Sequence, residues 1–159
     1  MSKLHRVTLT AAAILISTGL HAADAIDYPG DYRQWTHAKS MTVHAGHALE
    51  TPFKGIHHVY ANAAAVDGLR GGEYADGASF AFDQFDYVTR DKLSTEGKRV
   101  LLGVMVKDRA RFPDTGGWGF EAWAGDSRSQ RLVNDGGQSC YGCHTQVEKR
   151  GYVFTEWRD

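Results

Sequence analysis

The sequence predicts an α+β fold, a mainly antiparallel β-sheet of about five strands with short helices and a C-terminal helix that carries a cysteine pair. Segments rich in β-branched and aromatic residues recur along the chain, at residues 56–60, 78–88, 100–106 and 118–123. The helical patterns between them are short, and no internal repeat or second domain is visible. Strands that follow one another without long helices between them favour an antiparallel sheet over alternating βα units.

The chain of 159 residues begins with a segment typical of a signal peptide. Lys3 and Arg6 precede a short apolar run at residues 7–20, and alanines follow, so we expect cleavage between Ala22 and Ala25. The run is interrupted by Thr and Ser, which disfavours a membrane span, although an uncleaved N-terminal anchor is the alternative. We therefore predict a signal peptide at residues 1–23 and export to the periplasm.

Residues 24–159 are predicted to form the mature domain, which is long enough for one hydrophobic core. Loss of Lys3 and Arg6 with the signal peptide would change the formal net charge from −1 to −3. A weakly acidic domain lacks the basic surface that binds nucleic acid or an anionic membrane. No later stretch is long and apolar enough to cross a bilayer, so we expect no nucleic-acid partner and no membrane span in the mature chain.

The mature domain opens at residues 27–35, where Gly30 and Asp31 are expected to begin a short helix. Residues 40–44 are predicted as a strand, and a turn then leads to Pro52. The strand at 56–60 alternates, which places Ile56, His58 and Tyr60 on one face, and His57 and Val59 on the other.

The middle of the chain combines a short helix with a long strand. Asn62 is expected to cap a helix over residues 63–69, which glycines then end. A turn at Asp76 and Gly77 leads into the strand at 78–88. Alternation along this strand puts three side chains on one face, Phe80, Phe82 and Gln84.

The rest of the sheet is predicted from two apolar segments. Residues 89–98 are charged and polar, so we expect an exposed loop there, and residues 100–106, the most apolar run, are predicted as a central strand. The strand at 118–123 carries Trp118, Phe120 and Ala122 on one side. Residues 132–137 then lead into the cysteine-bearing helix, and residues 151–155 are expected to return as an extended tail.

The clearest chemical motif is Cys140-x-x-Cys143-His144, which has the spacing for covalent attachment of a c-type haem. On a helix, residues three and four apart share a face, so these three side chains converge. The two thiols can bond to the haem vinyl groups, and His144 can bind the iron as an axial ligand. We therefore expect one covalently attached haem c, held by Cys140, Cys143 and His144, with His144 as the metal ligand.

Other chemistry of a cysteine pair stays open at this point. A disulfide or a thioredoxin-type redox pair is possible in an exported protein. A zinc site needs four ligands, and a second cysteine pair is absent from the sequence. The haem interpretation is favoured because the chain has no other cysteine, a histidine follows Cys143 directly and the chain is predicted to be exported.

An ordered set of short motifs resembles the cytochrome P460 family over nearly the whole mature chain. The haem motif near the C-terminus is followed by Tyr152-Val153-Phe154-Thr155. The remaining motifs are, in order, Tyr32-Arg33-x-Trp35, Val59-Tyr60, Asp76-Gly77, Val106-Lys107-Asp108 and Gly117-Trp118-x-Phe120. The resemblance implies a mainly β, homodimeric protein whose five-coordinate haem has one open face.

One position departs from the hydroxylamine-oxidising members of that family, which carry a lysine cross-linked to the porphyrin. Counted from Asp76-Gly77, Phe82 stands at that position, and no lysine lies between Lys54 and Lys92. In this respect the chain is similar to the cytochrome c′-β branch, where an aromatic cap leaves room for a small gas. The resemblance also places His57 on the distal side of the haem, where another member has arginine.

The leading functional hypothesis is a haem protein that binds a small gas, such as nitric oxide or carbon monoxide, beneath Phe82. One alternative is an enzyme that oxidises hydroxylamine or a related nitrogen compound, with His57 or Glu121 as a proton acceptor. Another is an electron-transfer cytochrome with a redox partner protein, which needs a sixth iron ligand from His57, His58, Met41 or Met105. We expect both methionines in the core, and His37, His44 and His47 in solvent.

Overall fold

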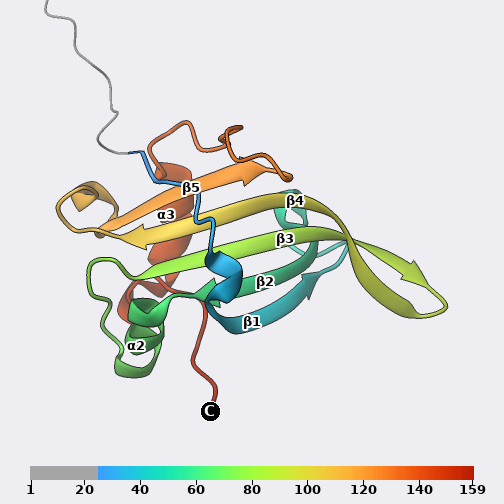
Figure 1. The fold of residues 1–159 in the computed structure, drawn as a ribbon, viewed down its shortest axis with the longest axis horizontal. Helices are drawn as coiled ribbons and strands as arrows, with labels where there is room; N and C mark the ends of the chain where they lie inside the picture. The colour runs from blue at the N-terminus through green and yellow to red at the C-terminus, as the bar shows by residue number, and fades with distance from the viewer. Residues whose placement is uncertain (1–24) are drawn as a thin grey trace, which may run out of the picture.

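The computed structural model describes residues 25–159, so the expected signal peptide at residues 1–23 lies outside the described residues. Five strands form one antiparallel sheet in the order β1-β2-β3-β4-β5 (Figure 1). Their bounds are Thr36–Val43 for β1, Gly55–Ala61 for β2, Ser79–Arg90 for β3, Leu93–Lys107 for β4 and Trp118–Ala124 for β5. The predicted fold class is therefore confirmed.

The helices are short and lie at the sheet's faces and ends. The α-helices are α1 (Glu50–Phe53), α2 (Ala63–Gly71) and α3 (Gln138–His144), and the 3₁₀ turns are η1 (Tyr32–Gln34), η2 (Pro113–Thr115) and η3 (Thr145–Arg150). No helix in residues 25–159 is long and apolar enough to span a membrane. The predicted tail at 151–155 has no regular secondary structure, but Val153 and Thr155 are buried.

Two hydrophobic cores lie on the two faces of the sheet. On one face, residues of α2 and α3 pack with Val59, Phe80, Met105 and Phe120. On the other, the N-terminal segment with Tyr32 packs against a second cluster, and η1 lies across the sheet in Figure 1. The alternation predicted for residues 56–60 and 118–123 is confirmed, because Val59, Trp118 and Phe120 pack in the first cluster, whereas Tyr60 and Trp123 pack in the second. We call the side with α2 and α3 the helix face.

Asn62 begins α2 as predicted. Its side-chain Oδ1 accepts hydrogen bonds from the backbone N–H of Ala65 at 2.9 Å and of Ser79 at 3.0 Å. Its Nδ2 donates to the carbonyl of Gly77 at 2.9 Å. The helix ends at Gly72, whose φ of 84° is a conformation that favours glycine. Asn62 therefore joins the start of α2 to the turn that leads into β3.

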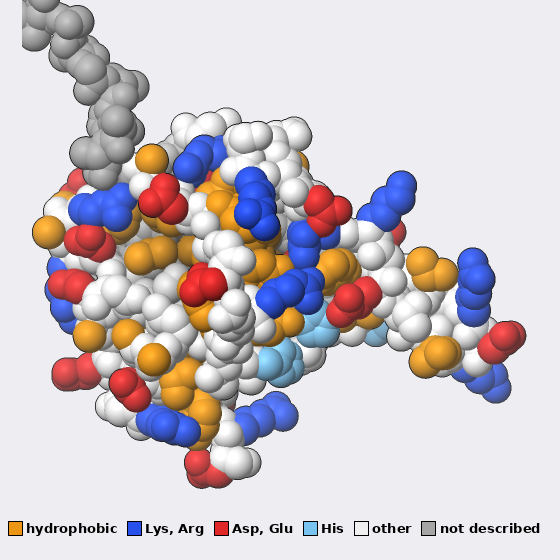
Figure 2. Space-filling view, viewed as in Figure 1, with side chains coloured by type: hydrophobic (Ala, Val, Ile, Leu, Met, Phe, Trp, Pro, Cys, Tyr) orange, Lys and Arg blue, Asp and Glu red, His pale blue; other side chains and the backbone are white. Residues whose placement is uncertain are grey.

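The exposed loop predicted for residues 89–98 is wrong, because β3 and β4 continue as a paired hairpin to a turn at Asp91 and Lys92. Both turn residues have positive φ, 50° and 67°, and Arg90 pairs with Leu93 across the turn. The residues are mostly exposed, as expected. The strand was missed because a ribbon that buries neither face needs no alternation of apolar and polar residues. Figure 1 shows the hairpin projecting beyond the sheet, and Figure 2 shows hydrophobic side chains exposed on it.

A buried carboxylate on β3 organises the face opposite the helices. Asp83 is 0% exposed and accepts hydrogen bonds from the Tyr32 hydroxyl at 2.6 Å and from Arg99 Nε at 2.7 Å. Arg33 also donates a hydrogen bond to Asp83 at 3.0 Å, and Arg99 forms an ion pair with Asp126. Two guanidinium groups offset the cost of burying this charge. The network therefore holds β3 in place from the sheet face opposite the helix face, at the residue between Phe82 and Gln84.

Candidate functional site

Helix α3 brings the two cysteines and the histidine together as the motif predicted. Cys140 and Cys143 are both free thiols and both partly buried. The helix begins after Gly137 (φ 84°), and the Asp135 carboxylate accepts from the backbone N–H groups of Gly137 at 3.0 Å and Ser139 at 2.9 Å. Burial raises the pKa of the Cys140 thiol, so it is protonated at neutral pH. Neither thiol is used in a disulfide, and both are available for bonding to another group.

His144 is held with one ring nitrogen free. Its Nδ1 lies 2.6 Å from the Tyr152 carbonyl oxygen, which can only accept, so Nδ1 carries the proton. The rings of Phe120 and Phe154 pack against the imidazole, with centroids 5.0 Å and 5.1 Å away. Burial lowers the pKa of His144, which favours the neutral ring. A neutral imidazole with Nδ1–H fixed by a carbonyl presents an unprotonated Nε2, the usual arrangement of a histidine metal ligand.

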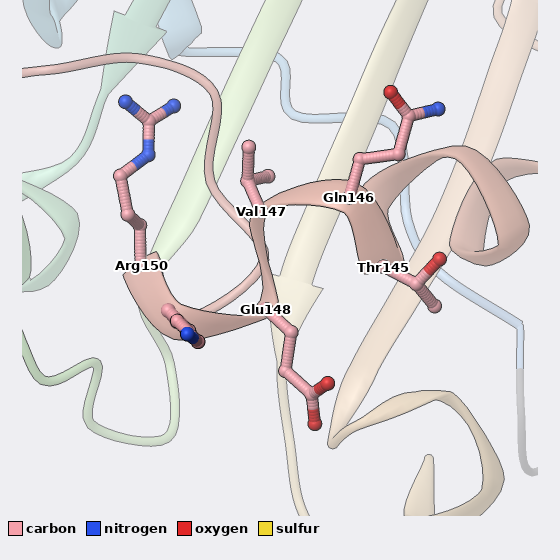
Figure 3. Close-up of a pocket in the computed structure, with 6 residues that line it drawn as sticks. Thr145, Gln146, Val147, Glu148 and Arg150 are labelled. Carbon is pink, nitrogen blue, oxygen red and sulfur yellow. The ribbon is translucent and has the colours of Figure 1, made fainter.

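The turn after α3 places the Tyr152 carbonyl at His144. Turn η3 folds the chain back, and the N–H of Tyr152 donates to the Val147 carbonyl at 3.1 Å. Gly151 and Tyr152 then adopt positive φ values of 66° and 68°. Figure 3 shows the turn, with Thr145 and Glu148 on one side and Gln146, Val147 and Arg150 on the other, lining a shallow hollow. These side chains shape the turn, and no residue predicted for the site lines that hollow.

The helix face of the sheet carries three rows of cross-strand partners. The first row is Ala61, Phe80, Met105 and Phe120; the second is Val59, Phe82, Gly103 and Ala122; the third is His57, Gln84, Leu101 and Ala124. The first row packs against His144 through Phe120. In the second row, Phe82, Gly103 and Ala122 are only partly buried although they face the helices. Partly exposed apolar residues on a core-facing surface are typical of a ligand site.

These residues fit a covalently bound haem. A flat macrocycle needs backbone or small side chains on the surface that it covers, and Gly103 and Ala122 supply them between bulkier neighbours. Two free thiols stand three residues apart on the adjacent helix, and the imidazole that follows has a bare nitrogen. Within residues 25–159 no cluster of three or more His, Cys, Asp or Glu side chains could hold a metal ion.

Phe82 and His57 lie together on this face. Their ring centroids are 4.7 Å apart, and Phe53 packs edge-on against Phe82 at 5.9 Å. His57 is 1% exposed, whereas Phe82 is partly exposed, so Phe82 covers His57. Burial lowers the pKa of His57, an effect that the nearby Phe53 backbone only partly opposes. The structure therefore brings the two predicted distal residues side by side, and their contact with a haem stays a prediction.

The other residues considered from the sequence lie elsewhere. Glu121 forms an ion pair with Arg131, and alternation along β5 places its side chain on the sheet face opposite the helix face. Met105 is buried in the core between Phe80 and Phe120, and Met41 is partly buried beside His57. His37, His44 and His47 are exposed, as expected. Sequence reasoning missed the hydrogen bond between His144 and the Tyr152 carbonyl. It also missed the hydrogen bonds from the Gln84 amide to two backbone carbonyls, although an amide within an apolar strand was a visible signal.

Comparisons with known proteins agree with this geometry. The family model described as Cytochrome P460 matches residues 29–155. That match covers most of the described chain, from the N-terminal segment through the five strands to the tail that follows the cysteine-bearing helix. No curated protein matches the chain.

Proposed function

The chain belongs to the cytochrome P460 family of haem proteins, and we propose that it is an exported protein whose covalently attached haem c keeps one open iron face for nitric oxide or carbon monoxide. Such a haem supplies a Lewis-acidic iron that binds diatomic gases. In this proposal Cys140 and Cys143 anchor the porphyrin, and His144 Nε2 is the axial ligand. The hydrogen bond from His144 Nδ1 to the Tyr152 carbonyl orients the ring for that role.

The observation that carries the proposal is Phe82. It stands where the hydroxylamine-oxidising relatives are expected to have their cross-linking lysine, and it lies on the helix face beside Gly103. An aromatic ring offers no amine for a porphyrin cross-link and no strong hydrogen-bond donor for bound dioxygen. These features support an assignment to the cytochrome c′-β branch and favour gases that need no hydrogen bond.

The electron-transfer alternative needs a sixth ligand on the iron. Met105 is ruled out as a ready ligand because it is enclosed between Phe80 and Phe120 in the core. His57 has unpartnered ring nitrogens, but Phe82 covers it and β2 restricts its movement. We therefore expect the ferrous iron to be five-coordinate.

The test is the absorption spectrum of the purified holoprotein, ferric and ferrous, with and without carbon monoxide. We expect a high-spin ferrous spectrum of an ordinary c-type haem, which changes on addition of carbon monoxide. The red-shifted band of the cross-linked relatives should be absent, and its presence would favour hydroxylamine oxidation. A low-spin ferrous spectrum that becomes high-spin in His57→Ala would establish His57 as the sixth ligand and favour electron transfer.

We also propose that the protein is a homodimer and that the β3–β4 hairpin takes part in the interface. The hairpin exposes Val88 and Leu93, at 44% and 66% of their surface, and isolated two-stranded ribbons are marginally stable in water. Its charges are of both signs, as a self-complementary contact requires. Sedimentation should detect a dimer that Leu93→Asp weakens, whereas Leu49→Asp, at another exposed leucine, should leave it intact. Equal behaviour of both variants would contradict the assignment of the hairpin.

A further inference from the structure

Three polar atoms on the helix face lack hydrogen-bond partners among residues 25–159. They are both ring nitrogens of His57 and Oε1 of Gln84. The Phe53 backbone lies near the His57 ring but makes no hydrogen bond of normal geometry with it. The two side chains are 1% and 0% exposed, so bulk water does not reach them. Buried polar groups in folded proteins nearly always have partners, and an exception calls for a water, a ligand or a functional role.

The amide of Gln84 has a fixed orientation. Its Nε2 donates to the backbone carbonyls of Pro52 at 2.9 Å and Lys54 at 3.0 Å. A flipped amide would set its oxygen against both carbonyl oxygens, which only accept hydrogen bonds. The unpartnered atom at the other end is therefore an acceptor, and it requires a donor from the same buried region.

His57, on the neighbouring strand, is a side chain that can supply this donor. His57 and Gln84 are direct cross-strand partners in β2 and β3, which places their Cβ atoms about 4.5–5.5 Å apart. A small side-chain rotation, or one bridging water, then connects the imidazole N–H to Oε1. A neutral imidazole has one N–H and one unprotonated nitrogen. If the N–H of His57 faces Gln84, the other ring nitrogen is therefore a bare, unprotonated acceptor.

We propose that Gln84 is a positioning residue that accepts the N–H of His57, and that the bare nitrogen of His57 accepts a proton from a small weak acid arriving at the haem. Suitable molecules are protic ligands of the H–X class, such as hydroxylamine or hydrogen cyanide, whereas carbon monoxide has no proton to transfer. Phe82, which covers His57, must move aside or admit a water for the proton to pass. The inference deepens the proposed function and rests on its open haem face.

The proton step is balanced without any oxidant. With hydrogen cyanide as the probe, the H–C bond breaks, its proton forms an N–H bond with the bare nitrogen of His57, and a cyanide anion is left to bind the ferric iron. His57 becomes an imidazolium ion, which its hydrogen bond to Gln84 can stabilise. The fall in the pKa of His57 caused by burial means that the proton is later released to water.

The first test reads the tautomer of His57 directly. Nitrogen NMR of isotope-labelled histidine, in the diamagnetic carbon monoxide complex, should show one fixed tautomer of His57 in the wild type. Gln84→Met keeps the length of the side chain but removes the acceptor, and it should give a mixture of tautomers. A wild-type spectrum with averaged tautomers overturns the proposal without any variant, and so does a Gln84→Met spectrum that is unchanged.

The second test compares a protic with an aprotic ligand. His57→Phe should slow association of hydrogen cyanide with the ferric protein by about 10²-fold, the usual contribution of a general base. Any change in carbon monoxide association with the ferrous protein reports only the altered packing beneath Phe82, since no proton moves in that reaction, and it should be at least about tenfold smaller than the change for hydrogen cyanide. His58→Phe, on the opposite face of the same strand, is the matched control and should leave both rates unchanged. Equal effects of His57→Phe on both ligands would overturn the proposal.

The outcomes separate this inference from the proposed function. Failure of the ferrous protein to bind carbon monoxide would reject the open iron face. Normal carbon monoxide binding with no difference between the two ligands in His57→Phe would reject the His57–Gln84 pair alone.

Discussion

At the scale of single residues, we propose that Phe82 controls access to the predicted haem face. Its ring is partly exposed and lies 4.7 Å from that of His57, between the buried imidazole and the outer surface. We predict that Phe82→Ala speeds carbon monoxide association about tenfold, because it removes bulk from the entry path. Flash photolysis of the ferrous complex measures this rate.

The conservative variant Phe82→Leu is the control, since it keeps most of the bulk and should remain close to the wild-type rate. The alanine variant also uncovers His57, which could then approach the iron. A low-spin ferrous spectrum in Phe82→Ala, absent from the double variant with His57→Ala, would show that this ring keeps the imidazole away. Identical association rates in all three proteins would mean that Phe82 does not cap the iron.

Tyr32 makes stability sensitive to alkaline pH. Burial first, and then its hydrogen bond to Asp83, raise the pKa of Tyr32 to about 12 from its ordinary value of 10.0. Because the folded-state pKa is raised, the stabilising effect is complete below pH 10.0 and is lost as the pH rises from there to about 12. Urea titrations across this range should show a smaller loss of stability in Tyr32→Phe than in the wild type. The same slope in both proteins would contradict the role of Tyr32.

The sequence predicted the contacts of a residue with its near neighbours in the chain, but not its contacts with residues far away in the chain. Cys140, Cys143 and His144 lie within five positions, so their convergence follows from helix geometry alone. The face of Gln84 was also predictable from alternation, but its role was not. Its amide is fixed by carbonyls of Pro52 and Lys54, about thirty residues earlier, and no local pattern encodes that contact.

At the scale of elements, Asn62 joins the start of α2 to the turn before β3. We predict that Asn62→Ala lowers the free energy of unfolding by about 1–2 kcal/mol, because the N–H groups of Ala65 and Ser79 lose their acceptor. Urea denaturation measures this loss. Asn62→Asp is the matched control: it keeps the acceptor and loses only the donor to Gly77, so its effect should be smaller. Equal losses would show that the cap itself is not what stabilises this junction.

The strands illustrate why some elements were predictable and others were not. The cores of β2, β3, β4 and β5 bury one or both faces, and their apolar residues therefore follow a pattern that marks a strand. The outer hairpin buries neither face, so its polar sequence resembles a loop while backbone pairing such as Thr89 with Ser94 makes it a ribbon. Register across the sheet was beyond prediction, because it is set jointly by the turns and by packing on both faces.

At the scale of the whole molecule, two opposite surfaces of one sheet have different tasks. The Asp83 network and the N-terminal segment hold the sheet from one side. On the other side, α3 and the tail hold His144 against Phe120, whose strand also carries Ala122 in a row of small, partly exposed residues with Gly103. One wall of the candidate site is thus built on paired strands, which favours a rigid surface for a planar group.

This division predicts how the molecule depends on its cofactor. In a Cys140→Ser, Cys143→Ser double variant the haem is no longer bound covalently, and denaturing mass spectrometry should show the bare polypeptide, whereas the wild type should retain one haem. The sheet should survive, because its strand pairing does not involve α3, so far-ultraviolet circular dichroism should remain dominated by β-structure. The strip around Phe82 and Gly103 would be left without its covering group.

We expect the double variant to lose roughly 3 kcal/mol of stability, or about 10 °C in Tm, since a group that binds only the folded state stabilises it. It should also bind a hydrophobic dye that the holoprotein excludes. Leu49→Ser, at an exposed leucine outside the hairpin, is a control that should leave the haem attached and bind no additional dye. A double variant with the Tm of the wild type and no dye binding would mean that the strip beside α3 is covered by the chain itself, and that the haem lies elsewhere.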